Sequence, residues 1–182
     1  INEGFSGKVN LFLIRSLFNN ANTIISNSKG VDEDLKSLMP ILVKTIVINN
    51  PVDIEHINLS LNDESSISFN FKKNVRYIIS VGRIIPLKRN QDLLHAFYKL
   101  RKHDKSLELI FLGDGISRSY LDELSIKLDI VNKVHFIGNV SNPFYYLNRS
   151  DLFVLNSETE GFPNVLVEAL ASGIPVVSSD CK

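Results

Sequence analysis

Two glutamates near the end of the chain, Glu160 and Glu168, flank the start of a predicted helix. Pro163 suits the first position of that helix, where its missing N–H is no loss, and Gly173 suits the end. A helix N-terminus presents unpaired N–H groups and a partial positive charge, so it can hold a phosphate. Glu168 would repel that phosphate, and it suits paired hydroxyls such as those of a ribose. A phosphate beside a diol indicates a nucleotide.

Basic, polar and glycine residues follow the other predicted strands. These residues are Gly82, Arg83 and Lys88 after the first strand, Gly113, Asp114 and Gly115 after the second, and Gly138, Asn139 and Val140 after the third. Glycine lets a backbone approach a ligand, and Arg83 and Lys88 can neutralise a pyrophosphate, the arginine through a bidentate fork. Each signal alone is weak. Their position at one predicted edge is the stronger observation.

Each of these residues also has an ordinary structural interpretation. A single Gly-x-Gly is usually a strand-to-helix turn, Arg83 and Lys88 are often solvated surface charges, and Glu168 could face water on an amphipathic helix. The chain contains neither a P-loop nor a complete GxGxxG motif, so an ordinary nicotinamide-binding domain is poorly supported. Cys181 is interpreted as a buried small apolar residue.

Strands that alternate with helices are expected to position these residues. The predicted strands after residue 74 are 75–81, 107–112, 133–137, 151–155 and 175–178. Between them, Asn90 is expected to cap one helix, Pro143 to open another, and Val165, Leu166, Ala169 and Leu170 to form the buried side of the last. The pattern predicts an α/β fold with a doubly wound parallel sheet, whose ligands bind beyond the carboxyl ends of the strands.

The earlier part of the chain predicts a smaller unit of the same kind. A helix is expected over 9–20, a strand over 21–26, a helix over 28–39 and a strand over 44–48. A strand, a helix and a strand in this order imply a parallel pair. The polar stretch 60–74 is interpreted as a linker or surface hairpin.

Composition limits the classes of function. The 182 residues carry 20 basic and 20 acidic side chains. The chain therefore has no excess of positive charge that would favour binding to nucleic acid. A single cysteine excludes an internal disulfide and a cysteine-rich metal site, and it fits a cytoplasmic compartment. No apolar run approaches the roughly 20 residues of a membrane span. The chain opens at Ile1 and stops after a strand-like run, so we interpret it as a fragment cut at both ends.

Four motifs together resemble a known family. Glu160-Gly161-Phe162-Pro163 followed by Glu168 is similar to the E-x7-E signature of retaining glycosyltransferase family four. The runs 81–83 with Lys88, 111–115 and 134–138 resemble that family's VGR…K element, GDG turn and V-x-F-x-G strand. The resemblance covers about 75–180 and departs mildly at Asn50-Pro51, where the family more often has Asn-Gly.

The resemblance implies the two-domain GT-B architecture, of which this chain would hold one Rossmann-like half. Residues 1–50 would end the N-terminal acceptor-side domain, 51–74 would link the domains, and 75–182 would form part of the C-terminal nucleotide-sugar domain. Without the acceptor-binding domain, the isolated piece is expected to bind nucleotide weakly and not to transfer sugar at a useful rate.

The resemblance also implies roles for single residues. Arg83 and Lys88, beside Gly82 and Gly113, would hold the donor's diphosphate, and Glu168 would bind the ribose. Glu160 would approach the donor sugar and, with Arg83 and Lys88, serve catalysis. The donor's base would lie against Gly138, Asn139 and Val140. The distal phosphate and the sugar would lie against Gly161, Phe162, Pro163, Asn164 and Val165.

The implied function is transfer from a UDP- or GDP-sugar to a saccharide or lipid-linked acceptor, in bacterial surface polysaccharide synthesis. No metal or other cofactor is expected, because basic side chains and the helix end would stabilise the leaving group. The resemblance suggests a cytoplasmic protein that works at the inner face of the membrane. Two alternatives stay open: a non-catalytic nucleotide-binding or scaffolding module, and an epimerase of the same architecture.

Overall fold

A computed structural model describes residues 13–14, 17–38, 40–65 and 69–181. The chain separates into two compact units, Ile1–Pro51 and Val52–Lys182. In the first unit, strands β1 (Thr23–Ser26) and β2 (Lys44–Val47) pair in parallel, with helix α2 (Lys29–Leu38) between them in the sequence. The predicted strand–helix–strand unit is therefore confirmed. The helix predicted over 9–20 falls largely outside the described residues, and its described end is a 3-10 helix, Phe18–Asn20.

The second unit contains a parallel sheet in the order β5-β4-β3-β6-β7. The strands are β3 (Arg76–Val81), β4 (Leu107–Leu112), β5 (Val134–Gly138), β6 (Leu152–Leu155) and β7 (Val176–Ser178). The chain first builds outward from β3 to β5 and then returns to place β6 on the other side of β3. This reversal confirms the predicted doubly wound sheet, and it creates a switch point between β3 and β6.

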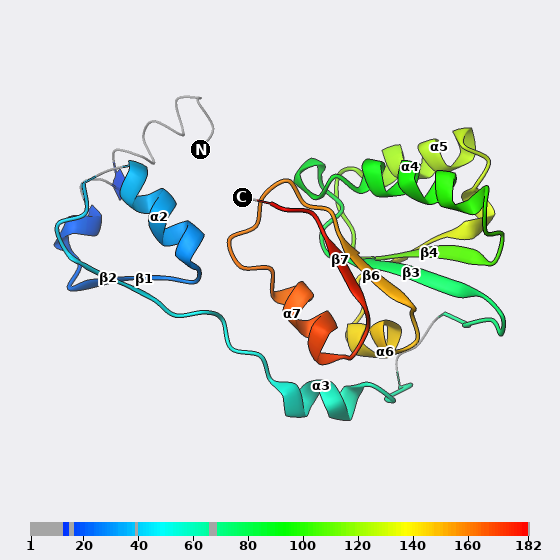
Figure 1. Ribbon diagram of the computed structural model, residues 1–182, viewed down its shortest axis with the longest axis horizontal. Coiled ribbons are helices and arrows are strands. Elements are labelled where there is room, and N and C mark those ends of the chain that lie inside the picture. Colours follow the sequence, from blue (N-terminus) through cyan, green and yellow to red (C-terminus); the bar gives the residue numbers. More distant parts are fainter. Residues whose placement is uncertain (1–12, 15–16, 39, 66–68, 182) are drawn as a thin grey trace. The chain divides into compact units, whose positions relative to one another are not determined.

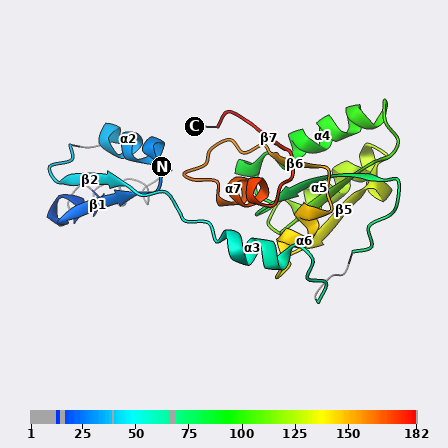
Figure 2. The same cartoon turned by 60° about the horizontal axis from the view of Figure 1, so that its bottom comes forward.

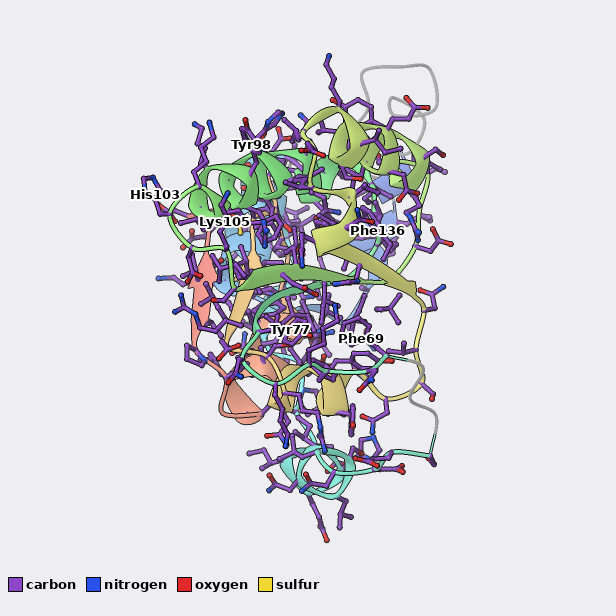
Figure 3. All side chains as sticks on the ribbon, turned by 90° about the vertical axis from the view of Figure 1, so that its right-hand side faces the viewer. Phe69, Tyr77, Tyr98, His103, Lys105 and Phe136 are labelled. Atoms are coloured by element: carbon purple, nitrogen blue, oxygen red, sulfur yellow. The ribbon has the colours of Figure 1, made fainter. Side chains whose placement is uncertain are left out.

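Helices cover both faces of this sheet (Figure 1). Helices α4 (Asn90–Arg101) and α5 (Arg118–Lys127) lie on one face, and α6 (Pro143–Asn148) and α7 (Asn164–Ala171) lie on the other. Strand side chains alternate between the two cores, so Ile78 packs under α4 and α5 and Ile79 packs under α6 and α7. Figure 3 shows the same division, with Tyr98 and Phe136 on the α4–α5 side and Phe69 and Tyr77 on the other.

The segment before β3 is more ordered than its polar composition predicts. Helix α3 (Ile54–Ser60) begins at Asp53, whose side chain accepts from the His56 N–H at 2.8 Å. Helix α3 lies beside α6 (Figure 2), where the Asn142 side chain donates to the Ser60 carbonyl at 2.8 Å. Phe71 packs against the core. The assignment of residues 51–74 as an interdomain linker stays a prediction.

Several local expectations were wrong. Asn90 does not cap α4, because Arg89, with a left-handed φ of 48°, takes the N-cap position and Asn90 is the first helical residue. Helix α7 begins at Asn164, so Pro163 precedes it as the N-cap residue. Leu170 was expected on the buried side of α7, but it is 55% exposed. Ala169 is the residue of this helix that is buried in the core. Cys181 is only partly buried, at the edge beyond β7. Within the described residues, no helix is long and apolar enough to cross a membrane.

Candidate functional site

An ion pair marks the switch point of the sheet. Lys88, from the loop after β3, donates through Nζ to Oε1 of Glu160, from the loop after β6. The two side chains are 20% and 15% exposed, so the pair is largely shielded from water. Ligands of doubly wound sheets bind beyond the carboxyl ends of the strands at this point. The structure therefore brings together two residues that the sequence nominated separately.

The loop after β3 is shaped to deliver Lys88. Gly82 has a φ of 143°, which favours glycine, and a Cβ built on it would lie 3.9 Å from Cε of Lys88. A 3-10 helix, Pro86–Lys88, then turns the chain, and the Lys88 N–H donates to the Ile85 carbonyl at 3.0 Å. The lysine stem thus passes close to the Gly82 backbone.

Hydrogen bonds join the loop after β6 to the loop after β3. The Glu158 N–H donates to the Leu87 carbonyl at 2.8 Å, and the Asn156 side chain donates to the Arg89 carbonyl at 2.5 Å. Ser157, which is 2% exposed, donates through Oγ to Oε1 of Glu160 at 2.6 Å. The ion pair is therefore held from both loops.

Arg83 is the exposed cation of the site. Its side chain has no hydrogen-bond or ion-pair partner within the part of the chain that the structure describes. It lines one hollow with Gly82, Lys88 and Ser157, and it also lines a neighbouring hollow. That second hollow is bordered by Val81, Gly82, Arg83, Leu112, Gly113, Asn139, Val140 and Pro143. Predicted residues from three loops thus meet around one arginine.

The glycines after β4 are needed for packing of the backbone. A Cβ on Gly113 would lie 2.1 Å from the Gly82 carbonyl oxygen, and one on Gly115 would lie 2.3 Å from the Ile84 oxygen. The Gly113 N–H donates to the Gly138 carbonyl at 2.7 Å. By contrast, a Cβ on Gly138, whose φ is 85°, would meet no atom within 4 Å. The backbone at Gly138 therefore borders open space.

The start of α7 follows Glu160 by four residues. The Asn164 N–H donates to the Phe162 carbonyl at 3.0 Å, and the N–H groups of Leu166 and Val167 both donate to the Pro163 carbonyl. Among the described residues, none accepts a hydrogen bond from the Val165 N–H, as expected for the first turn of a helix. The loop that carries Glu160 therefore leads directly to an amide that can hold an anion.

Glu168 lies in the middle of α7 and is partly buried. Its carboxylate has no partner among the described residues, and burial raises the pKa of this carboxyl group. A partly buried acceptor without a donor costs the free protein stability, and a ligand hydroxyl would satisfy it.

Two residues of the site were missed from the sequence. Ser157 holds Glu160, and Asn156 contributes a buried Oδ1 that has no hydrogen-bond partner in the described structure. The spacing of Ser157, three residues before Glu160, is the only signal that could have indicated it. No group of three or more metal-ligating side chains is found among the described residues.

Comparison with known proteins agrees with this architecture. The family model described as "Glycosyl transferases group 1" matches residues 62–182. An uncharacterized glycosyltransferase of Methanocaldococcus jannaschii is 32% identical over 99% of this chain and 45% of its own length. The N-acetylgalactosamine-N,N'-diacetylbacillosaminyl-diphospho-undecaprenol 4-alpha-N-acetylgalactosaminyltransferase of Campylobacter jejuni is 34% identical over 99% of this chain and 47% of its own length. The chain thus spans about half the length of these relatives.

Solved structures show the same fold. Anabaena HepE in complex with UDP is 28% identical, with a TM-score of 0.79 over 100% of this chain and 51% of that protein. Staphylococcus aureus TarM, at 21% identity, has a TM-score of 0.78 over 100% of this chain and 34% of that protein, and it supports the fold alone. The parallel sheet is that of one half of the GT-B architecture. From its fold, its motifs and these matches, the chain belongs to the glycosyl transferases group 1 family.

Proposed function

We propose that this chain contributes the donor-binding half of a retaining glycosyltransferase that uses a UDP- or GDP-sugar. The acceptor would be a saccharide or a lipid-linked saccharide at the cytoplasmic face of a bacterial membrane, in surface polysaccharide synthesis. The Campylobacter relative, named for a diphospho-undecaprenol acceptor, supports this proposal. So does a Staphylococcus aureus capsular polysaccharide biosynthesis glycosyltransferase, 36% identical over 65% of this chain.

The ion pair of Lys88 with Glu160, beside the unpartnered Arg83, is the observation that carries the proposal. A nucleoside diphosphate needs cations at its two phosphates, and the Lys88 ammonium has three N–H donors, of which Glu160 takes one. We assign the diphosphate to Arg83 and Lys88, beside Gly82 and Gly113. The segment Gly161–Val165 would bind the distal phosphate and the sugar through the N–H groups that are not otherwise used, because Pro163 has no N–H and the Asn164 N–H donates to the Phe162 carbonyl.

The remaining parts of the donor follow from this placement. The ribose would lie at Glu168, whose carboxylate lacks a partner among the described residues, and the base would lie along Gly138, Asn139 and Val140. Glu160 would face the donor sugar. UDP and UDP-glucose occupy solved structures of HepE, which supports a uridine nucleotide as the first donor to test.

In the proposed reaction, the two cations and the start of α7 stabilise the negative charge of the leaving nucleoside diphosphate. The acceptor hydroxyl would attack the anomeric carbon on the face that the diphosphate leaves, without a protein nucleophile; the bond from that carbon to the diphosphate oxygen would break, and the leaving diphosphate would take up the acceptor's proton. Charge stabilisation would then require no metal. The acceptor-side domain would complete the site, so the 182-residue chain alone would bind nucleotide weakly and not transfer sugar.

Charge reversal at Arg83 tests the proposal. In the full-length protein, Arg83→Glu is expected to weaken UDP binding about tenfold or more, because a charge-assisted contact becomes a repulsion, and to change uridine binding far less. Isothermal titration with UDP, GDP and uridine measures this. Lys99→Glu, an exposed reversal on α4, serves as the control and is expected to leave UDP binding unchanged.

Equal losses for UDP and uridine would mean that Arg83 does not contact phosphate. The two alternative functions are separated by product analysis of the wild-type protein. An epimerase would change the sugar without an acceptor, and a scaffolding module would bind the nucleotide and consume none. Transfer requires an acceptor and releases the nucleoside diphosphate.

A further inference from the structure

Ser157 belongs to the site by its contacts, although nothing in its residue type marks it. It lies in the loop after β6 and is 2% exposed. Its hydroxyl donates to Oε1 of Glu160 at 2.6 Å. A buried hydroxyl that donates to a carboxylate forms one of the stronger hydrogen bonds of a protein interior.

The two contacts of Glu160 fix the direction of its carboxylate. Lys88 and Ser157 both donate to Oε1 and approach it from different loops. Within the described structure, Oε2 accepts no hydrogen bond. Glutamate has three rotatable side-chain bonds, so one ion pair alone would allow the carboxylate to swing. The second contact holds Oε1 inward and leaves Oε2 available to a ligand.

The backbone around Ser157 is itself anchored on two sides. Its carbonyl accepts from Oγ of Ser179, beyond β7, at 2.7 Å. The next residue, Glu158, donates its N–H to the Leu87 carbonyl in the loop after β3. The hydroxyl therefore has a fixed origin, which a residue needs if it is to orient another.

We propose that Ser157 is a positioning residue for sugar transfer: it holds Glu160 so that Oε2 faces the donor sugar while Lys88 serves the diphosphate. This inference rests on the proposed function. Small errors in the placement of a group beside the reacting centre lower the rate of reaction strongly. Ser157 does not touch the substrate and acts through Glu160.

The test uses the full-length protein and a sugar nucleotide that the wild type consumes, chosen from UDP-glucose and UDP-N-acetylglucosamine. Ser157→Ala is expected to lower kcat about tenfold, the loss typical of a hydrogen bond to a charged group. UDP affinity is expected to change less than about twofold, because UDP lacks the transferred sugar that Glu160 would face. Ser125→Ala, which removes an equally buried hydroxyl in α5, is the control and is expected to change neither.

A double-mutant cycle separates positioning from a general structural effect. In a Glu160→Ala background, Ser157→Ala is expected to change turnover less than about twofold, because its target is gone. The affinity of each variant for the intact sugar nucleotide is measured as well. The coupling between the two residues can then be determined even if Glu160→Ala leaves no detectable rate. If Ser157→Ala does not fold, Ser157→Cys, with its weaker donor, replaces it.

Equal losses in the two backgrounds would overturn the proposal, as would a loss of UDP affinity as large as the loss of turnover. A folded Ser157→Ala protein with wild-type kcat would do the same. If the wild-type protein binds neither UDP nor GDP and consumes no UDP- or GDP-sugar, the proposed function fails instead. The two failures are therefore distinguishable.

Discussion

Two charged residues of the candidate site, Glu168 and Arg83, have no side-chain partner among the described residues. Glu168 is also partly buried. Arg83 is exposed and likewise unpartnered in the described structure, whereas Lys88 is paired. Both unpartnered groups can gain hydrogen bonds on binding, which is how binding energy is concentrated at a site.

Removing the charge of Glu168 is expected to stabilise the ligand-free protein. Burial raises the pKa of this carboxyl group, so the charged form costs stability at neutral pH, and that cost disappears as the pH falls through the folded-state pKa. Glu168→Gln should therefore increase the free energy of unfolding at pH 7, by less than about 1 kcal/mol because water still reaches the side chain.

Urea denaturation at a series of pH values measures the difference between the two proteins. The gain is expected to shrink toward zero as the medium becomes acidic and the wild-type carboxyl takes up a proton. Glu123→Gln, at an exposed position of α5, is the matched control. A gain that stays constant with pH, or a destabilised variant, would show that burial of the charge is not the cause.

The residue contacts were harder to predict than the residue identities. Glu160, Lys88 and Arg83 were nominated from the sequence, but Lys88 and Glu160 are 72 positions apart, and no pattern indicates that they pair. Ser157 was missed because serine is common in loops. Its importance comes from burial and from the direction of one hydroxyl, and both are set by the tertiary structure.

At the scale of elements, the loops after β3, β4 and β5 form one backbone network. The Gly82 N–H donates to the Leu112 carbonyl, the Ile84 N–H to the Asp114 carbonyl, and the Gly113 N–H to the Gly138 carbonyl. This network holds Arg83 and Lys88 beyond the strand ends. These loops pack backbone against backbone, so the positions of Gly113 and Gly115 after β4 have no room for a side chain.

Comparing two glycines tests this account of the loops. Both Gly113 and Gly138 have a positive φ, of 121° and 85°, so alanine costs each about 1–3 kcal/mol of backbone strain. Only at Gly113 does the added Cβ also collide with a carbonyl oxygen, so Gly113→Ala should destabilise by about 1–3 kcal/mol more than Gly138→Ala. Thermal or urea unfolding of the two variants gives the difference. Equal losses would mean that the loops can separate at no cost.

Alternation of strands and helices was predictable because each strand of a parallel sheet is buried on both faces and reads as an apolar run. The bounds of β4 were correct, and α6 begins at Pro143 as expected. Helix α3 was missed because it is short and lies in a polar stretch, and because its fixing contacts come from α6, about 80 residues later. The cap of α4 was also mispredicted, because Arg89 adopts a left-handed backbone conformation and takes the N-cap position that was expected for Asn90.

The chain as a whole has no net charge, so attraction of the proposed anionic donor must come from local groups. The sheet order supplies that locality, because β3 and β6 are neighbours and the loops that follow them meet through the ion pair of Lys88 with Glu160. The chain spans 45% of its archaeal relative and 47% of its Campylobacter relative. Sugar transfer is accordingly proposed for the whole protein.

A crystal structure of the full-length protein with UDP would show where this site holds the nucleotide. We expect the diphosphate to lie between Arg83, Lys88 and the first turn of α7, with the ribose hydroxyls on Glu168 and the base beside Gly138–Val140. UDP bound elsewhere, with these residues unoccupied at saturating nucleotide, would contradict this placement.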